Sequence, residues 1–387
     1  MPVLHCPRMT SKPKSNSEPA RNLILISGYY GFDNLGDEAI LEEIVAELLQ
    51  VASPEEIYVL SANPERTAQV FGVQSIPRND FWLVLNLFKY TRLFISGGGG
   101  LFQNTRTVGS IMFYGLQIMM ARLLGAKVMI YAQGVGPLRG GLAKALTKKA
   151  FGFADAITVR DAASQEMLGE WQIAAVKTAD PVWCLNSRPL PEAVDQQLRD
   201  ISAAKLVGLS LRPSRNFSES HLRALALSLH QTMPTNFHLL LLALQNEQDN
   251  DTLLKFAEVW QELGRSSTMV RTSHIQYPSQ WIALFGRCKL VVGMRLHALI
   301  MSMKAGVGVV GIAYDPKVHH LLTEFELPIL NLTKEPQPIE WEQTLKLAFS
   351  DMDKLSRHAM RKAEGAKKLA CQNFNLLDRI LRMQSDS

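Results

Sequence analysis

The sequence predicts an α/β protein of two domains, each built on a mainly parallel sheet that is covered by helices. Two observations lead to this prediction. Short β-rich runs alternate with helix-length segments along most of the chain, and the alternation breaks once, at residues 186–200. Alternation of this kind is typical of βαβ units. With 387 residues, the chain is also long enough to bury two hydrophobic cores of ordinary size.

The elements of the first half follow one another from the first strand-like run. The predicted strands are residues 22–27, 56–61, 92–100, 127–137 and 156–161. The longest predicted helices between them are residues 35–50 and 110–125. The next segment, NSRPLPEAVDQQLRD, is charged, carries proline at two positions and has no strand-like run. We therefore predict an N-terminal domain at residues 22–187 and a linker at residues 188–200.

The alternation resumes after the linker. The predicted strands of a C-terminal domain, placed at residues 201–340, are residues 206–213, 237–244, 268–273, 289–297, 306–314 and 327–332. Residues 341–387 follow as a helical segment rich in basic residues, with Gly365 as a point of interruption. Two open α/β domains in tandem form a cleft where the carboxyl ends of both sheets face each other, so we expect functional residues there.

The composition argues against several classes of protein. Residues 1–21 are polar and lack the apolar core of a secretion signal, so a disordered tail is predicted. The most apolar windows are far shorter than the roughly 20 residues that cross a bilayer. The net charge of +5 is mild and no basic block is interleaved with aromatic residues, so no nucleic-acid partner is expected. The four cysteines are scattered, which favours a reducing compartment.

The stretch SGYYGFDNLGDEAILEE joins the first strand to the first helix through a glycine-rich loop. Asp37 and Glu38 fall in the first helical turn, where the helix dipole favours negative charge, and this role is sufficient for Glu38. A glycine-rich loop with two exposed tyrosines instead suits the close approach of a ligand. Asp37 is therefore a candidate acceptor-binding residue or catalytic base, with a role in the helix terminus as the alternative.

Two further glycine clusters follow buried strands and leave backbone amides open to cradle an anion or a sugar hydroxyl. The predicted cradle residues are Gly97, Gly98, Gly99, Gly100, Gly134 and Gly136. The spacing of the second cluster departs from the dinucleotide fingerprint, and the sequence has no G-x-x-x-x-G-K-[ST] motif. Neither a nicotinamide cofactor nor a P-loop is expected, and no cofactor is predicted.

Metal ligands have little support in the sequence. Asp249 and Asp251 form a D-x-D that could hold a nucleotide-bound divalent ion, but they precede a helical run and are interpreted as its caps. His319 and His320 are adjacent, so on a helix they diverge by about 100°. No metal site is predicted.

Basic side chains follow several predicted strands. Arg295 and His297 lie between a buried strand and a helix, and Arg160, Arg212 and Lys317 follow other strands. Gathered in one empty cleft these groups would repel one another, and an anion would relieve the repulsion. Guanidinium groups bind carboxylate or phosphate through paired hydrogen bonds, so a small molecule bearing both groups is expected. Alternatively, Arg295 pairs with an acid and His297 is a packing residue.

Six stretches, spread in order from residue 28 to residue 318, carry a family resemblance: GYYGFDNLGDEAIL, FISGGGGLFQ, YAQGVGPL, ITVRD, GMRLHALIMS and GIAYDPKV. Together they resemble the polysaccharide pyruvyl transferases, particularly the CsaB type. The resemblance implies two Rossmann-like domains facing a central cleft, a GT-B-like fold, with the acceptor on the N-terminal side and the donor on the C-terminal side.

The resemblance also implies an activity. A pyruvyl group passes from phosphoenolpyruvate, the donor substrate, to two hydroxyls of one sugar, which forms a ketal and releases phosphate. Carried over by motif, Arg160 and Lys317 clamp the donor and His297 is the acid that protonates it. Arg212 and Arg295 join the donor-binding set from their positions alone. Asp37 is the acceptor-side candidate.

The acceptor implied by the resemblance is a cell-wall polysaccharide or lipid-linked glycan, modified in the cytoplasm at the inner face of the plasma membrane. Pyruvylated wall polymers of this kind anchor S-layers. The basic C-terminal segment either makes peripheral contact with anionic lipid or is simply a solvated face.

Two other functions remain open. A GT-B glycosyltransferase that uses a nucleotide sugar would need an acidic residue for the ribose, and Glu324 or Glu326 could serve. A catalytically silent anion- or glycan-binding protein is the second.

Overall fold

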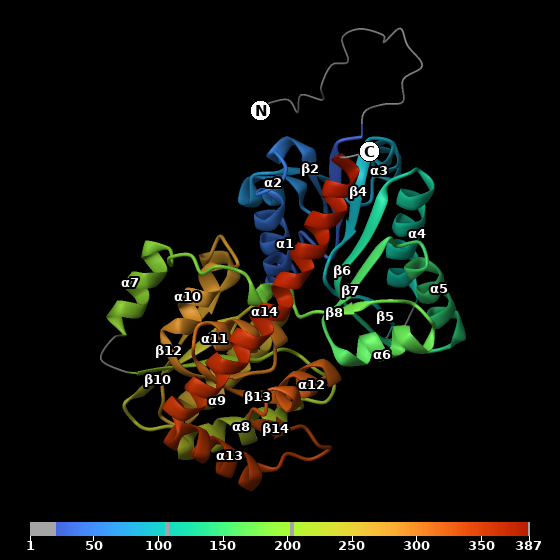
Figure 1. The fold of residues 1–387 in the computed structure, drawn as a ribbon. Helices are drawn as coiled ribbons and strands as arrows, with labels where there is room; N and C mark the ends of the chain where they lie inside the picture. Colours follow the sequence, from blue (N-terminus) through green and yellow to red (C-terminus); the bar gives the residue numbers. More distant parts are fainter. Residues whose placement is uncertain (1–20, 105–107, 202–204, 386–387) are drawn as a thin grey trace, which may run out of the picture.

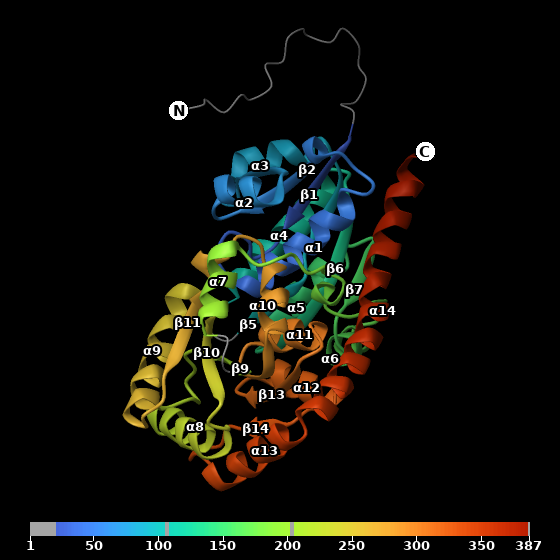
Figure 2. The ribbon, with the colours of Figure 1, turned by 90° about the vertical axis from the view of Figure 1, so that its left-hand side faces the viewer.

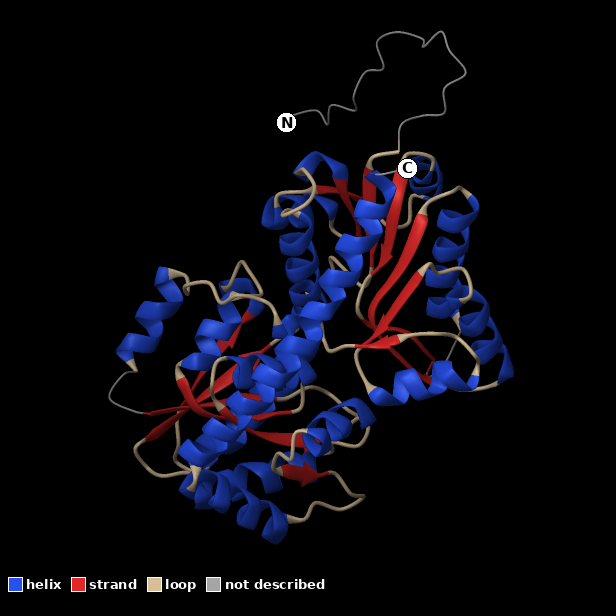
Figure 3. Cartoon of the chain, in the orientation of Figure 1, coloured by secondary structure: helices blue, strands red, loops and turns tan. Residues whose placement is uncertain are grey.

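The computed structural model describes residues 21–104, 108–201 and 205–385, which form two α/β domains and a long C-terminal helix (Figure 1). Helices flank the strands in both domains (Figure 3). The two-domain α/β prediction is therefore confirmed. Except for Arg21, the predicted disordered tail lies outside the described residues.

The first sheet is parallel, with the strand order β3-β2-β1-β4-β6-β7-β8, and β5 pairs with β6 beside this path. Its strands are β1 (Leu23–Ser27), β2 (Ile57–Ser61), β3 (Gln74–Pro77), β4 (Thr91–Ser96), β5 (Gly99–Asn104), β6 (Lys127–Leu138), β7 (Ala156–Val159) and β8 (Val176–Lys177). Its helices are α1 (Leu35–Leu48), α2 (Pro64–Phe71), α3 (Phe81–Phe88), α4 (Gly109–Leu123), α5 (Gly141–Phe151) and α6 (Ala162–Glu170).

The second sheet is also parallel, with the order β11-β10-β9-β12-β13-β14. Its strands are β9 (Lys205–Ser210), β10 (Phe237–Ala243), β11 (Ser267–Arg271), β12 (Cys288–Gly293), β13 (Gly308–Ala313) and β14 (Ile329–Asn331). The helices of this half are α7 (Glu192–Asp200), α8 (Glu219–Thr232), α9 (Asn246–Glu262), α10 (Gln280–Gly286), α11 (Leu296–Lys304), α12 (Pro316–Glu324) and α13 (Pro338–Ser350).

The central strands follow from their residues. β12 reads CKLVVG and is buried except at Lys289, as expected for a parallel strand covered on both faces. In each sheet the strand order reverses beside the first strand: β1 lies between β2 and β4, and β9 lies between β10 and β12. Ligands of open α/β sheets bind beyond the carboxyl ends of the strands at such switch points. The topology therefore directs attention to the segments that follow β1, β4, β9 and β12.

Helix α14 (Met352–Ser385) runs from the second domain along the side of the first (Figure 2). The predicted interruption at Gly365 is wrong, because α14 is continuous there and the break from α13 falls at Asp351. A mid-helix glycine costs about 1 kcal/mol relative to alanine, and burial of the apolar face of α14 outweighs this cost. Ala359 and Leu377 are two of the residues that α14 buries.

The two domains share one hydrophobic core cluster on the side of α14. It includes Ile26 of β1, Trp183, Leu299 of α11 and Leu377 of α14. The segment predicted as a linker, residues 188–200, contains helix α7 from Glu192 onward. None of the described helices is long and apolar enough to cross a membrane.

Two cysteines that lie far apart in the sequence meet in this region. The Sγ atoms of Cys184 and Cys371 are 2.9 Å apart, and both residues are free thiols. The scattered positions of the cysteines along the chain gave no indication of this contact.

Candidate active site

The predicted site residues lie just beyond the carboxyl ends of strands or in the first turns of the helices that follow them. Asp37 lies in the first turn of α1, and His297 lies in the first turn of α11, directly after β12. Lys317 lies in the first turn of α12, whose N-cap is Asp315. The Asp315 carboxylate accepts the Lys317 backbone N–H at 2.8 Å and so fixes this turn. Arg160 follows β7 directly.

A buried carboxylate, Asp180, organises the centre of the cluster. Its Oδ2 lies 2.7 Å from Nη1 of Arg160 and 3.4 Å from Nε2 of His297. Burial by itself raises the pKa of Asp180, but the charges of His297 and Arg160 outweigh burial and hold this pKa well below its usual range. Asp180 therefore stays ionised and contacts one basic side chain from each domain.

The glycine clusters make room for charged side chains. A Cβ added at Gly36 would lie 1.9 Å from Nδ1 of His297, and one at Gly100 would lie 2.4 Å from Nζ of Lys317. Added at Gly134, it would lie 2.9 Å from Nε of Arg160. Any larger residue at these positions would push the charged groups apart. The absence of side chains at these glycines therefore allows the charged side chains of the cluster to lie close together.

The prediction that the glycine run forms a backbone cradle needs correction. The space beside Gly97 is filled by the Tyr30 hydroxyl, and the space beside Gly98 by Ile40. The Gly97 amide donates to Ser27 O at 2.7 Å, so it is not open to a ligand. Both Gly99 and Gly100 belong to strand β5. The sequence could not show this, because protein side chains from distant segments occupy the space that the glycines leave.

The remaining predicted cradle glycines also face protein atoms. Gly134 lies against Arg160, and Gly136 lies near Cε of Met167 in α6. Both glycines belong to strand β6.

Lys317 and Asp37 are buried and have shifted pKa values. Nζ of Lys317 donates to Oε1 of Gln103 in β5 at 2.6 Å. Burial, with repulsion from Arg160, lowers the pKa of Lys317 to about 8. Burial raises the pKa of Asp37 to about 6, although His297, Arg160 and Lys317 all lower it. Both groups can therefore change charge near neutral pH.

The two arginines added from position alone have different environments. Arg295 is buried and donates from Nε to Oδ2 of Asp249 at 2.8 Å and from Nη2 to Gln245 at 3.1 Å. The guanidinium of Arg212 instead lies over the Tyr314 ring at 5.2 Å, with Nη1 3.1 Å from its hydroxyl. Arg295 is thus held by protein groups, which is the alternative that the sequence left open.

Two of these cations have buried acidic partners, which reduces the repulsion that was expected in an empty cleft. Arg160 pairs with Asp180 and Arg295 pairs with Asp249. A buried guanidinium without a partner is costly, so the fold supplies a carboxylate to each. Within the described residues, no carboxylate lies within 4 Å of Arg212 or of the Lys317 amine. These two groups keep their charge available at the cleft.

The predicted capping role of Asp249 and Asp251 also needs correction. Both residues lie inside α9 rather than before it. The Asp249 carboxylate accepts the backbone N–H groups of Leu244 and Gln245 and binds Arg295. Across the described ranges, no group of three His, Cys, Asp or Glu residues is placed to hold a metal ion.

The cluster opens into a cleft between the domains. A cavity of about 720 Å³ is lined by residues that include Asp37, His297, Arg212 and Lys317. It shares Asp37, Arg212 and Lys317 with a larger opening of about 1490 Å³ that extends over the N-terminal domain. A buried nitrogen of the cluster, Nε of Arg212, has no hydrogen-bond partner within the described residues, whereas Nε2 of His297 faces the Asp180 carboxylate at 3.4 Å. Nε of Arg212 is positioned to bind a ligand.

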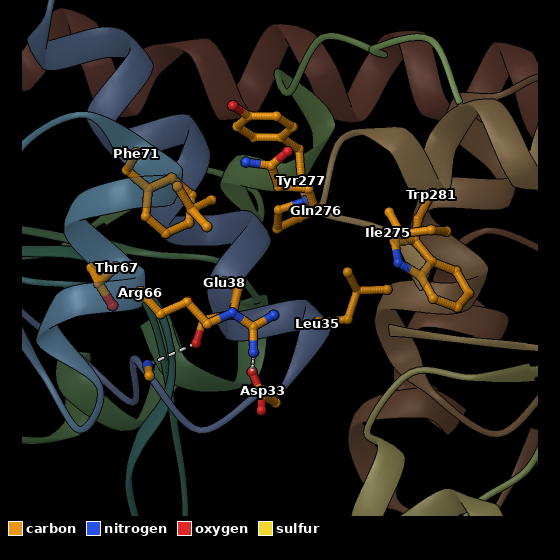
Figure 4. Close-up of a pocket in the computed structure, with 13 residues that line it drawn as sticks. Asp33, Leu35, Glu38, Arg66, Thr67, Phe71, Ile275, Gln276, Tyr277 and Trp281 are labelled. Atoms are coloured by element: carbon orange, nitrogen blue, oxygen red, sulfur yellow. Dashed lines mark hydrogen bonds and ion pairs between the residues drawn. The ribbon is translucent and has the colours of Figure 1, made fainter. Parts of the chain in front are cut away.

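A separate pocket of about 490 Å³ lies beside the loop that follows β1 (Figure 4). Its charged side chains are engaged: Arg66 pairs with Asp33, and Glu38 accepts the Gly31 N–H at 2.7 Å. Burial raises the pKa of Glu38 to about 7. Much of the remaining wall is apolar and includes Trp281. Arg66, the one cation that lines this pocket among the residues that the structure describes, is already paired, so the pocket does not suit a doubly acidic ligand.

Several residues of the site were missed by the sequence analysis. Asp180 stands before Pro181, a dipeptide that indicates a turn and gives no sign of a buried ion pair. Gln103 and Tyr314 lie within the quoted stretches FISGGGGLFQ and GIAYDPKV but carry no charge. Asp180 and Gln103 act through contacts between the two domains, and Tyr314 through a contact with Arg212 within the second domain. No local pattern reveals such contacts.

The fold has many solved counterparts. HepE from Anabaena in complex with UDP and glucose has a TM-score of 0.62 at 13% identity, covering 94% of this chain and 100% of that chain. UDP-GlcNAc 2-epimerase from Neisseria meningitidis bound to UDP-GlcNAc has a TM-score of 0.62 at 10% identity, covering 93% and 100%. Sucrose-phosphate synthase from Thermosynechococcus elongatus has a TM-score of 0.55 at 14% identity, covering 94% and 100%. At these identities the likeness establishes the fold alone.

These likenesses place the protein in the GT-B-like class, with two α/β domains on either side of a cleft. More narrowly, the chain belongs to the polysaccharide pyruvyl transferase family, which matches residues 34–316. No curated protein matches the sequence significantly.

Proposed function

We propose that the protein transfers a pyruvyl group from phosphoenolpyruvate to two hydroxyls of one sugar in a cell-wall or lipid-linked polysaccharide, forming a ketal and releasing phosphate. The observation that carries the proposal is the convergence of Arg160, Arg212, His297 and Lys317 from four strand ends in two domains. Membership of the pyruvyl transferase family supports it independently.

The charges of the cleft suit this donor. Phosphoenolpyruvate carries a carboxylate and a phosphate ester on the same carbon atom. Arg212 and Lys317 lack a carboxylate within 4 Å in the described part of the chain, so they are assigned to the two acidic groups. The charge of Arg160 is balanced by the paired Asp180 carboxylate, so Arg160 is assigned a weaker role in orienting the donor than Arg212 and Lys317. Arg295, bound to Asp249, holds the start of α11 in place and is assigned a positioning role.

The reaction balances with the groups at hand. His297 gives a proton to the methylene carbon of the donor, which becomes a methyl group and leaves the central carbon electrophilic. One sugar hydroxyl adds to that carbon, the carbon–oxygen bond to phosphate breaks, and the second hydroxyl adds. The two hydroxyls lose two protons: one restores His297 and the other leaves with phosphate. Asp37 accepts the first of them from the sugar hydroxyl and passes it on to His297, and its pKa of about 6 suits a base near neutral pH.

The acceptor and the location belong to the same proposal. Three parts of this proposal rest on the motif resemblance. They are the CsaB-type assignment, an acceptor that is a wall polymer anchoring S-layers, and a cytoplasmic position at the inner membrane face. Helix α14 carries basic residues that would support contact with anionic lipid: Lys354, Arg357, Arg361, Lys362, Lys367 and Lys368. Lys362 is already paired with Glu326, which weakens its part in such a contact.

Glycosyl transfer from a nucleotide sugar is the second candidate, because structures of this fold in complex with UDP exist. The acidic residues that it would need for the ribose are engaged elsewhere. Glu324 is paired with Lys177 and Glu326 with Lys362, both at the surface. The geometry therefore favours pyruvyl transfer.

The experiment that separates the two candidates follows released products. The purified protein is incubated with a panel of methyl hexopyranosides and either phosphoenolpyruvate or UDP-sugars. Pyruvyl transfer predicts phosphate release and a sugar that gains the mass of a ketal. Release of UDP with no phosphate from phosphoenolpyruvate would establish the second candidate instead.

A further inference from the structure

The loop after β1 presents an aromatic surface to the cleft. The rings of Tyr29 and Phe32 are stacked, with centroids 4.2 Å apart and planes inclined by 10°, and each residue is 37% exposed. Of the two tyrosines that were expected to be exposed, only Tyr29 is accessible, because Tyr30 is buried. Exposed aromatic rings that are held in a fixed stack are suited to a ligand with an apolar face.

Arg78 completes this surface. Its guanidinium lies 5.2 Å from the Phe32 ring centroid and 4.6 Å from that of Phe113. The group donates to Gly28 O and to the Tyr114 hydroxyl, both at 3.1 Å. In the described chain no carboxylate lies within 4 Å of Arg78. The guanidinium is thus fixed by rings and neutral oxygens, which leaves its remaining N–H groups able to donate to neutral hydroxyls.

The position of this surface relates it to the proposed chemistry. Tyr29, Arg78 and Phe113 line the same opening as Asp37 and Lys317, on the side of the N-terminal domain. Burial and the nearby Asp37 raise the pKa of Tyr29, so its hydroxyl stays protonated and can donate. A ring held against Tyr29 would lie beside the proposed base and face the donor-binding cations.

We propose that Tyr29, Phe32 and Arg78 form a platform for a hexopyranose ring of the acceptor, which stacks the C–H face of the sugar on Tyr29 and donates to its hydroxyls from Arg78. The platform rests on the proposed function, since it names the acceptor subsite of the same cleft. A pyranose has an apolar face and a polar edge, which matches rings bordered by a guanidinium. A second anionic group is a poorer match, because the Arg78 charge is already spread over three ring faces.

The test measures sugar binding by the full-length protein in the absence of phosphoenolpyruvate. Saturation-transfer NMR is recorded with the methyl α- and β-pyranosides of glucose, galactose and mannose. The wild type is expected to transfer saturation to the ring protons of at least one pyranoside. Tyr29→Ala and Phe32→Ala should each weaken binding roughly tenfold. Tyr29→Phe keeps the ring and should bind within about threefold of the wild type.

The control is Trp82→Ala, which removes an exposed ring of α3 that does not line the cleft. It should bind pyranosides as the wild type does. If Tyr29→Ala binds like the wild type, or if the wild type binds none of the pyranosides, the platform is refuted. Phosphoenolpyruvate binding is measured separately by calorimetry. A wild type that binds pyranosides but not phosphoenolpyruvate supports the platform and contradicts the proposed donor.

Discussion

The amine of Lys317 lies beside the Cα of Gly100 and donates to Gln103 at 2.6 Å, so a cation of the second domain is held by a strand of the first. The contact exists only because Gly100 has no side chain. Lys317 is also shared by three of the cavities that meet at the centre of the molecule. The position of the Lys317 amine, whose charge faces the proposed donor, therefore depends on how closely the two domains approach each other.

Gly100→Ala tests this relationship. The new Cβ would lie 2.4 Å from Nζ of Lys317, and the flexible end of the lysine would move away from it. We expect phosphoenolpyruvate affinity, measured by calorimetry, to fall roughly tenfold. The free energy of unfolding should change by less than about 1 kcal/mol, because no backbone must shift. Gly169→Ala, where an added Cβ meets no atom within 4 Å, is the control and should bind as the wild type does.

Asp180→Asn should destabilise the protein strongly. The change removes the charge that balances buried Arg160 at 2.7 Å, and loss of one partner of a buried ion pair costs about 3–5 kcal/mol. Urea unfolding measures the effect. Asp33→Asn breaks the exposed pair with Arg66 and should cost no more than about 1 kcal/mol. Equal costs for the two variants would mean that the Asp180 carboxylate does not hold the cluster together.

Two groups with shifted pKa values, Asp37 and Lys317, should contribute to the dependence of the rate on pH. Asp37 must be ionised to act as a base, so kcat/KM should rise as pH increases through about 6. Lys317 must be protonated to bind the anion, so kcat/KM should fall as pH increases through about 8. Arginine stays protonated at higher pH than lysine, so in Lys317→Arg the fall in kcat/KM should occur at higher pH. If the fall occurs at the same pH as in the wild type, another group is responsible for it.

Stability should also depend on pH through Glu47 of α1. Burial raises the pKa of Glu47 to about 8, although the hydrogen bond from the Tyr131 hydroxyl lowers it. The folded state therefore binds the proton more tightly than the unfolded state, in which the pKa is about 4.3. The contribution of Glu47 to the free energy of unfolding should therefore be greatest below about pH 4.3. This contribution should decrease as pH rises towards 8.

Glu47→Gln checks this linkage by urea unfolding across the same pH range. The neutral side chain should reduce the slope of stability against pH. It should not abolish the slope, because burial also raises the pKa of Glu43 to about 7 and its effect has the same sign. An unchanged slope in Glu47→Gln would show that Glu47 is ionised in the folded protein at neutral pH.

Gly365→Ala should stabilise the protein by about 0.5–1 kcal/mol. Gly365 lies inside continuous α14, and an added Cβ meets no atom within 4 Å. Alanine has the higher helix propensity and loses less conformational entropy on folding. The change is measured by thermal or urea unfolding. A loss of stability would indicate that the glycine is needed for a bend or a contact at this point of α14.

The sequence predicted most strands of the fold, because buried parallel strands such as β10 and β12 are continuous apolar runs. It missed β3 and β8, which are short and carry little apolar character, and it did not separate β5 from β4, because β5 begins within the glycine run. The ends of these apolar runs also indicate where the strands end, which is why His297 and Lys317 were predicted as site residues. The acids that pair with the arginines were not found, since Asp249 lies 46 residues from Arg295 in sequence. Ion pairs between distant elements depend on packing that no local pattern encodes.

The central claim is that His297 protonates a phosphoenolpyruvate molecule held by Arg212 and Lys317. The most direct measurement is the reaction of phosphoenolpyruvate with an accepted sugar in heavy water, followed by mass spectrometry and NMR of the product. The account predicts a pyruvyl ketal whose methyl group carries one solvent-derived deuterium, formed about 10²–10⁴-fold more slowly by His297→Ala. Phosphate release without deuterium in the product methyl group, or full activity of His297→Ala, would contradict it.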